Sequence, residues 1–165
     1  MCLAPTGKLG GSAYRPERMI GLLQRVSEAS VTIATERVAA IGPGLLVLVG
    51  IERGDAEPEA DRLAERLLAY RVFADAEGRM NLSVCDAGGG VLLVPQFTLA
   101  ADTDQGNRPG FSRAASPALA AELFGHLVQC FRARGVDPQC GVFGAHMQVG
   151  LVNDGPVTFW LRVPA

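Results

Sequence analysis

The chain has 165 residues, of which 48% are hydrophobic and 19% are charged, and its formal net charge is −2. This length suits one domain that buries ~70% of the surface exposed by its unfolded chain, and the composition excludes an intrinsically disordered protein. The balance of 15 basic against 17 acidic residues excludes a strongly basic protein that coats nucleic acid. It leaves room for a protein that touches a small part of a nucleic acid.

The apolar runs, the N-terminus and the cysteines favour a cytoplasmic protein with no membrane association. The longest uncharged apolar run, at residues 41–51, has about half of the ~20 residues that a membrane-spanning helix needs. The first seven residues lack the apolar core of a secretory signal. The four cysteines form no C-x-x-C pair, so we expect free thiols in a reducing compartment.

The first 18 residues differ in character from the rest of the chain. They contain the only lysine, Lys8, together with a glycine pair and no apolar periodicity. We expect residues 1–18 to be a disordered extension or the product of a start codon assigned too early. The folded domain is then expected to cover residues 19–165.

Three strands are predicted before the first helix. A β-favouring stretch begins at Ile20 and contains a bulge or turn at residues 27–30, and a second short strand covers residues 37–41. The continuous apolar run at residues 45–51 predicts a strand that is buried on both faces.

Two long helices are predicted from apolar periodicity. Over residues 55–73 apolar side chains recur with the spacing of one buried helix face, and the polar side chains between them, including Asp61, are expected to face solvent. The second helix is expected to begin with Ser116 as N-cap and Pro117 in its first turn, and to end at Gly135.

The remaining elements are short strands and loops. A turn leads into a short strand at residues 75–82, and a buried strand follows at 91–94. Residues 101–115 form a loop, and the two final strands cover residues 147–152 and 157–163. Residues 153–156 predict a tight hairpin between the last two strands, in which the Gly-Pro bond can be cis at a cost of about 0.5–1 kcal/mol. This order favours the α/β class, with layered mixed β-sheets and two long helices in a single domain.

Common catalytic and metal-binding motifs are absent from the sequence. It has no P-loop, no dinucleotide-binding motif and no nucleophile elbow. His126 precedes Cys130 by four residues on the second predicted helix, and His146 follows Cys140 by six, but neither pair has the further ligands of a metal site. We therefore expect no metal and interpret His126 as an ordinary helix-face residue.

Two segments remain as candidates for a site. The segment at residues 95–99, Pro-Gln-Phe-Thr-Leu, follows a buried strand, and strand ends commonly face a ligand crevice. Spacing alone favours a simpler alternative, in which Phe97 and Leu99 belong to the core and Thr98 is a strand residue. For residues 153–156, spacing alone favours a plain hairpin turn.

Several motifs, taken in their order and spacing, carry a specific family resemblance. They are LQRV at residues 23–26, DAEGRMNL at 75–82, QFTLAADT at 96–103, Ala115-Ser116-Pro117, MQV at 147–149 and LVNDGPVTFWL at 151–161. With them, residues 19–163 resemble the D-aminoacyl-tRNA deacylase family.

The resemblance implies a cofactor-free enzyme that hydrolyses the ester bond of D-aminoacyl-tRNA and rejects L-aminoacyl-tRNA. Its partner is then the aminoacylated 3′ end of tRNA, with no DNA and no membrane involved. The resemblance further implies a homodimer with the fold of this family. Its Gly155-Pro156 motif is cis and crosses the interface into the pocket of the other subunit, and Arg25 holds the motif in place.

The resemblance also assigns residues to the pocket. Gln96, Phe97 and Thr98 are implied to line the catalytic pocket, and Phe143 and Met147 to flank the terminal adenosine of the tRNA. We expect direct attack by water, with backbone amides near Phe97 and Thr98 forming an oxyanion hole. The resemblance suggests that the 2′-hydroxyl of the terminal ribose helps to activate the water.

Chiral selection of this kind has a simple steric basis. D and L substrates exchange the hydrogen and the side chain on one carbon, so a rigid wall of main-chain carbonyls beside that carbon clashes only with an L side chain. Glycine has no side chain to exclude, so Gly mischarged on tRNA(Ala) is also expected to be cleared.

Three alternatives stay open. Pro95 stands where most family members have serine, and an animal branch with relaxed chirality shares this proline but has alanine at the position of Phe97. A relaxed-chirality aminoacyl-tRNA deacylase is therefore one alternative. The others are a non-catalytic module that binds the tRNA end and a small-molecule esterase.

Overall fold

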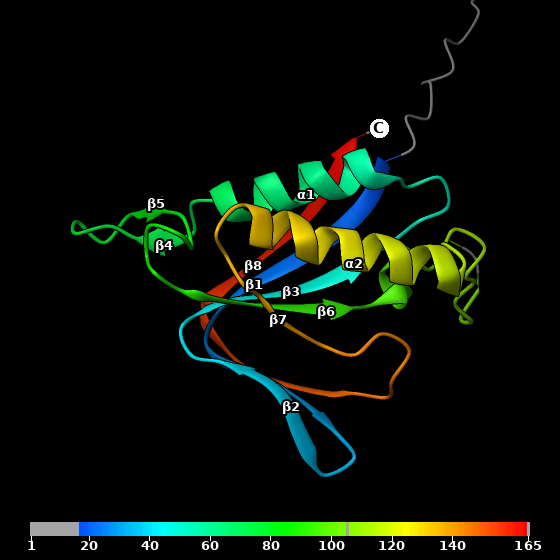
Figure 1. Cartoon of the computed structure of the whole chain (residues 1–165), viewed down its shortest axis with the longest axis horizontal. Helices are drawn as coiled ribbons and strands as arrows, with labels where there is room; N and C mark the ends of the chain where they lie inside the picture. The colour runs from blue at the N-terminus through cyan, green and yellow to red at the C-terminus, as the bar shows by residue number, and fades with distance from the viewer. Residues whose placement is uncertain (1–16, 105, 165) are drawn as a thin grey trace, which may run out of the picture.

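The computed structural model describes residues 17–104 and 106–164, in which two helices lie on one face of a mixed β-sheet (Figure 1). The elements in chain order are β1 (Glu17–Ile33), β2 (Glu36–Ile41), β3 (Gly44–Gly50), α1 (Glu57–Ala69), β4 (Phe73–Ala74), β5 (Met80–Leu82), β6 (Gly90–Pro95), the short 3-10 helix η1 (Phe97–Ala100), α2 (Pro117–Ala133), β7 (Gln139–Cys140) and β8 (Gln148–Pro164). The main sheet has the order β2-β1-β3-β6-β7, and β8 pairs with β1. The predicted α/β architecture is confirmed.

The sheet mixes parallel and antiparallel pairs. β1 is antiparallel to β2, β3 and β8, whereas β3, β6 and β7 run parallel to one another. β8 follows β1 along nearly its whole length, while β3 pairs with the first half of β1 and β2 with the second. The second half of β1, together with β2, bends away beneath the face opposite the helices (Figure 1).

The central strand β3 is buried on both faces, as predicted. Leu45, Val47 and Val49 belong to the core cluster that includes the apolar faces of α1 and α2. Leu46 belongs to a second cluster, where it joins Leu92 of β6 and residues of the bent half of β1. This alternation is the period of two expected of a strand, so apolar side chains at successive positions serve both faces.

β8 is one strand of 17 residues, so the predicted hairpin at residues 153–156 is wrong. Both halves of β8 pair antiparallel with β1, and the pairs that flank the interruption are Gln24 with Thr158 and Val26 with Asn153. The chain therefore keeps its direction, and residues 154–157 form a bulge opposite Arg25. Glycine is typical of bulges as well as of turns, and proline is tolerated in both, so composition could not separate the two.

Some boundaries differ from the predictions. α1 lies inside the predicted range, and Ser116 caps α2 by accepting a hydrogen bond from the N–H of Leu119 at 3.4 Å. The sequence pattern predicts neither η1 nor β7, because elements of four and two residues carry no periodicity. β1 begins at Glu17, two residues before the expected start of the domain, and the rest of the expected extension lies outside the described residues.

Two further expectations concern the membrane and the cysteines. Among the described residues, no helix is long and apolar enough to cross a bilayer. Cys85, Cys130 and Cys140 are free thiols, as predicted, and Cys2 lies outside the described residues.

Candidate functional site

A pocket of about 460 Å³ lies where β6 ends and η1 begins. Four of the predicted site residues line it, namely Gln96, Phe97, Phe143 and Met147. The remaining lining includes Pro95 and residues from the start of α2. Its volume is in the range of about 300–1,000 Å³ that is typical of small-molecule sites.

Backbone hydrogen bonds fix the start of η1. The N–H of Gln96 donates to the carbonyl of Val49 at 2.8 Å, which extends the pairing of β3 with β6 by one residue. The next bond runs from the N–H of Leu99 to the carbonyl of Gln96 at 3.2 Å. The N–H groups of Phe97 and Thr98 lie between these two bonds and have no partner within the helix. They are therefore placed to donate to a ligand oxygen.

The first two side chains of η1 turn outward. Phe97 is 58% exposed, and its ring centroid lies 5.1 Å from that of Phe111. Thr98 is exposed as well, and Nε2 of Gln96 donates a hydrogen bond to its Oγ1. The simpler alternative, with Phe97 in the core and Thr98 in a strand, is therefore wrong. The segment instead presents the ring of Phe97 and the amide of Gln96 to the pocket, whereas Thr98 is not among the residues that line it.

The loop before β8 forms another wall of the pocket. The N–H of Val142 lies 3.3 Å from Sδ of Met147, and a Cβ on Gly141 would lie only 2.9 Å from the same sulfur. Phe143 is half-buried and packs against the core. His146 also lines the pocket, although no sequence motif links it to the residues around Phe97 and only its spacing from Cys140 is notable in the sequence.

Arg25 and the bulge of β8 form a second group of predicted site residues. Nε of Arg25 donates to the carbonyl of Asp154 at 3.0 Å and lies 3.4 Å from the carboxylate of the same residue. Its Nη1 donates to the carbonyl of Val72 at 2.6 Å, so one guanidinium ties the bulge to the segment after α1. The peptide bond between Gly155 and Pro156 is cis, and both residues are exposed.

Gly155 occupies a backbone conformation that side chains rarely adopt, with φ of +141°. A Cβ there would lie 2.6 Å from Cγ2 of Val157 and 3.2 Å from Nη2 of Arg25. The side chain of Asn153 fixes the bulge from its base, because it accepts from the N–H of Val157 and donates to Oγ1 of Thr158, both at 2.8 Å. The bulge therefore requires glycine here and exposes main chain.

The two groups lie at opposite ends of the sheet within one chain. Arg25 pairs with Leu45 at the start of β3, whereas Gln96 bonds to Val49 near its end. Four residues along a strand and three strand spacings across the sheet amount to roughly 20 Å. Figure 1 likewise shows η1 at one end of the sheet and the sharp bend of β8 at the other. The pocket lining contains neither Arg25 nor the Gly-Pro motif.

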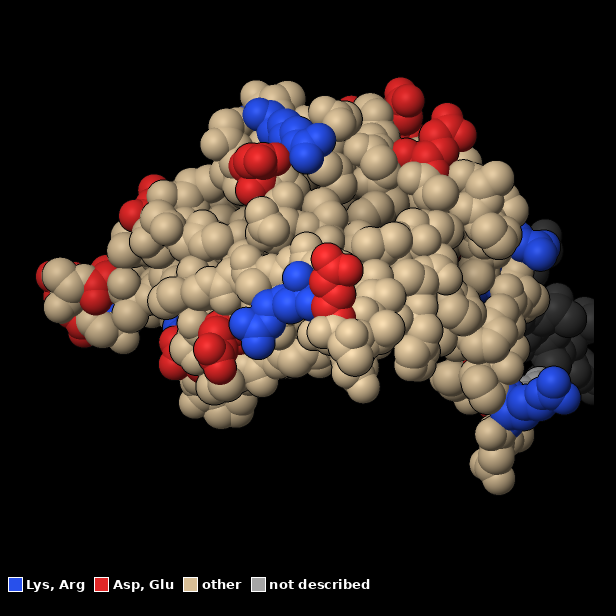
Figure 2. All heavy atoms as spheres, turned by 60° about the horizontal axis from the view of Figure 1, so that its bottom comes forward, with Lys and Arg blue, Asp and Glu red and all other residues tan. Residues whose placement is uncertain are grey.

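Charged side chains are scattered over the face shown in Figure 2. Some blue groups lie beside red atoms and others stand alone, with uncharged surface between the groups, so the described residues form no continuous basic patch on this face. Several arginines are paired with acids; Nε of Arg132, for instance, lies 2.8 Å from Oδ1 of Asp137.

Known proteins match this chain over most of its length. A family model described as D-Tyr-tRNA(Tyr) deacylase matches residues 22–162. The chain belongs to this deacylase family. The resemblance inferred from the motifs is thereby confirmed, and as a member of the family the protein is a hydrolase that acts on ester bonds.

Curated relatives of this deacylase family are similar in length and sequence. A D-aminoacyl-tRNA deacylase of Thioalkalivibrio sulfidiphilus is 61% identical over 146 residues, which are 88% of this chain and 98% of the relative. A D-aminoacyl-tRNA deacylase of Nitrosococcus oceani is 60% identical over 146 residues, which are 88% of this chain and 94% of the relative.

Solved structures share the fold of the deacylase. The structure of the c-Myc DNA Unwinding Element Binding Protein is 38% identical, with a TM-score of 0.83 over 88% of this chain and 99% of that one. The structure of a probable eukaryotic D-amino acid tRNA deacylase has a TM-score of 0.76 over the same shares of the two chains. At 18% identity, the second likeness concerns the fold alone.

Proposed function

We propose that the protein hydrolyses the ester bond of D-aminoacyl-tRNA to free D-amino acid and tRNA, and that it rejects L-aminoacyl-tRNA. The observation that carries the proposal is the pocket at the end of β6, where the exposed ring of Phe97 lies beside two backbone N–H groups without a helical partner. An aromatic ring suits a nucleobase or an amino-acid side chain, and paired N–H groups suit the carbonyl oxygen of an ester.

Catalysis in this pocket rests on the main chain. Water attacks the ester carbonyl carbon, and the N–H groups of Phe97 and Thr98 stabilise the negative charge that develops on the carbonyl oxygen. The ester C–O bond then breaks, and the ribose oxygen takes the proton that the water gives up. The hydroxyl of Thr98 is not the nucleophile, because its side-chain partner is the amide of Gln96, which is not a base. The 2′-hydroxyl of the terminal ribose helps to activate the water, as the family resemblance implies.

The Gly155-Pro156 motif acts in the pocket of a second copy of the chain. Within one chain the motif is roughly 20 Å from the pocket, so it can contribute to hydrolysis only in a homodimer. Exposed apolar side chains on β8 support self-association, since Trp160 is 48% and Val152 is 50% exposed. Arg25 is then the residue that positions the motif for the other subunit.

The main chain of the motif selects chirality. Gly155 has no side chain and no room for one, so the surface that it offers to the other subunit is backbone. A backbone wall beside the α-carbon of the substrate clashes with an L side chain and leaves a D side chain free. Phe143 and Met147 flank the terminal adenosine on the opposite wall. Glycine passes this filter, so Gly on tRNA(Ala) is a second substrate.

The test compares the hydrolysis of D-tyrosyl-tRNA with that of L-tyrosyl-tRNA by the full chain. We expect the D substrate to be hydrolysed at least ~100-fold faster, a difference of about 2.7 kcal/mol in transition-state binding. Similar rates would replace the proposal with a relaxed-chirality deacylase, for which Pro95 in the pocket lining is the relevant residue. Binding of both substrates without hydrolysis would indicate a module that binds the tRNA end.

Two further measurements complete the test. The ethyl ester of D-tyrosine should be cleaved far more slowly than the tRNA ester, and equal rates would identify a small-molecule esterase. Sedimentation at the assay concentration should show a dimer. A fully active monomer would contradict the shared site.

A further inference from the structure

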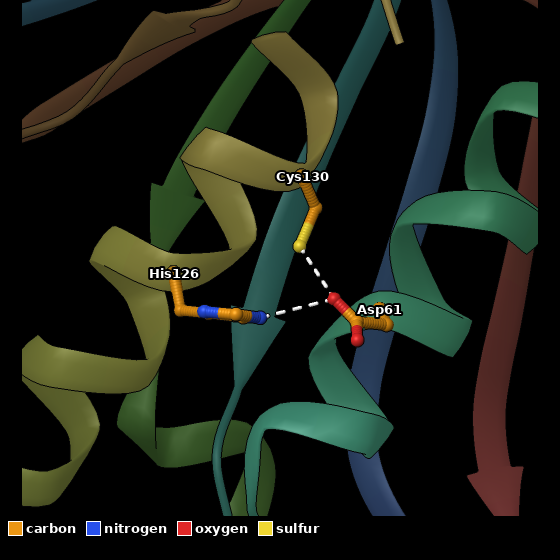
Figure 3. Close-up of side chains that lie close together, drawn as sticks. All are labelled: Asp61, His126 and Cys130. Carbon is orange, nitrogen blue, oxygen red and sulfur yellow. Dashed lines mark hydrogen bonds and ion pairs between the residues drawn. The ribbon is translucent and has the colours of Figure 1, made fainter. Parts of the chain in front are cut away.

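A second cluster of reactive side chains lies between the two helices, outside the proposed site. Asp61 projects from α1 toward His126 and Cys130 of α2 (Figure 3). Nε2 of His126 lies 3.0 Å from Oδ1 of Asp61, and Sγ of Cys130 lies 2.8 Å from the same oxygen. The three ligand atoms all lie within 4.8 Å of one another. This is a mixed nitrogen, oxygen and sulfur donor set.

The spacing of these atoms is close to that of a tetrahedral metal site. Zinc bonds of about 2.0–2.3 Å to nitrogen, oxygen and sulfur place neighbouring ligand atoms about 3.4–3.6 Å apart. The pairs that involve Asp61 are slightly closer than this, at 3.0 and 2.8 Å, as expected of hydrogen bonds that a cation would replace. Side-chain shifts of about 1 Å would open room for the ion.

The helical spacing brings four side chains together in the space between α1 and α2. His126 and Cys130 are four residues apart on α2, and Glu57 and Asp61 are four residues apart on α1, so each pair shares one face of its helix. Oε1 of Glu57 lies 3.6 Å from Nδ1 of His126, the ring nitrogen that Asp61 does not contact. When a metal takes the place of the hydrogen bond between Nε2 and Asp61, the ring proton is held at Nδ1, on the side of Glu57.

The surroundings of the cluster leave one side open to solvent. Cys130 is buried, whereas the side chain of Asp61 is exposed. The guanidinium of Arg134 is the neighbouring cation, and it donates to the carbonyl of Cys130 at 2.9 Å.

We propose that Asp61, His126 and Cys130 bind Zn²⁺, with water as the fourth ligand and Glu57 orienting His126. Imidazole and thiolate ligands favour Zn²⁺ over Mg²⁺ and Ca²⁺, which prefer oxygen. The side chain of Asp61 is 54% exposed, so the ion can enter from solvent. The bound ion links α1 to α2 and replaces the thiol proton of Cys130, which is released to solvent. The site is separate from the deacylase pocket, so this proposal does not depend on the proposed function.

The test is a titration of the reduced full chain with Co²⁺, followed by displacement with Zn²⁺. We expect one site, a thiolate-to-cobalt charge-transfer absorption and release of about one proton per ion near neutral pH. Cys130→Ser should abolish the charge-transfer band, and Asp61→Asn and His126→Gln should each weaken binding by at least ~10-fold.

Matched controls separate this site from other thiols. Cys85→Ser and Cys140→Ser remove thiols that lie outside the cluster, and both variants should bind Co²⁺ like the parent. Circular dichroism establishes that each variant is folded. A charge-transfer band that survives Cys130→Ser, or a parent protein that binds neither ion, would overturn the proposal and leave a hydrogen-bonded cluster only.

Discussion

Thr98 carries a side-chain hydroxyl in the segment that borders the pocket, yet its surroundings do not activate it. Its Oγ1 accepts a hydrogen bond from the amide of Gln96, whereas a nucleophilic hydroxyl needs a base that takes its proton. The backbone N–H of the same residue lacks a helical partner and is the group that we propose to stabilise the oxyanion. On this proposal, catalysis at Thr98 depends on the course of the main chain, which side-chain replacement preserves.

Thr98→Ala should accordingly retain hydrolysis of D-tyrosyl-tRNA to within ~10-fold of the parent rate, a change of at most about 1.4 kcal/mol. Single-turnover deacylation measures this rate directly. Complete loss of hydrolysis in a folded variant that still binds substrate would show that the hydroxyl itself reacts.

Gly155→Ala should abolish turnover of the D substrate, with a loss of at least ~100-fold. The added Cβ would lie 2.6 Å from Cγ2 and 2.9 Å from the backbone nitrogen of Val157, and φ of +141° is strained for alanine. Gly150→Ala is the matched control on β8, because its Cβ would meet only Oγ of Ser30 at 3.4 Å. Equal rates for the two variants would show that Gly155 does not act in the pocket.

At the scale of elements, apolar periodicity predicts the long helices, but it does not predict contacts that depend on how one element packs against another. The apolar stripe of α1 and the N-cap at Ser116 are local signals, and both predictions are confirmed. The same stripe assigns Asp61 to solvent, and the pattern of α2 makes His126 an ordinary helix-face residue. Only the packing of α1 against α2 brings these two side chains within 3.0 Å of each other.

Asp55 joins the start of β1 to the loop before α1. Its carboxylate accepts the N–H of Met19 at 3.0 and 3.1 Å and the N–H of Glu52 at 2.7 Å. Burial outweighs these hydrogen bonds and raises the pKa of Asp55 from its ordinary value of 3.8 to about 6. The folded protein therefore binds the proton of Asp55 more tightly than the unfolded chain does.

The pH dependence of stability follows from this shift. Protonated Asp55 stabilises the folded protein. This stabilisation is complete below about pH 4 and is lost as the pH rises through about 6. The amide that Asp55→Asn introduces does not titrate. From pH 4 to pH 8 the parent should therefore lose on the order of 2 kcal/mol of unfolding free energy relative to the variant. Urea unfolding at each pH measures it, and parallel curves would show that Asp55 titrates normally.

At the scale of the whole molecule, the net charge limits the number of tRNA phosphates that the protein can neutralise. The net charge is −2, and arginines such as Arg132 are already paired with acids. A protein that grips mainly the aminoacylated end neutralises few phosphates, so its affinity depends weakly on salt.

We expect the slope of log K against log salt concentration to be about −1 to −2, which corresponds to two or three phosphate contacts on single-stranded RNA. A tRNA carrying its D-amino acid through a non-hydrolysable amide allows the measurement by filter binding. A slope steeper than about −4 would require a basic surface that extends along the acceptor stem.

Sequence motifs point to both groups of proposed site residues but not to the distance between them. Gln96 and Phe97 follow β6, and Arg25 and Gly155 meet at the bulge. Their separation depends on the register of β1, β3, β6 and β8, which no single segment encodes. For the same reason, the composition of residues 153–156 could not show that β8 continues in one direction.

The bulge of β8 also bears on how this sequence can vary in length. Residues 148–153 and 158–164 are registered against β1 separately. A residue gained or lost within 154–157 leaves both registers unchanged, whereas the same change in either flank would exchange core-facing and solvent-facing side chains. A change of length within the motif therefore disturbs the hydrogen bonds of Asn153 and Arg25 but leaves the two strand registers intact, whereas a change in either flank disturbs the core.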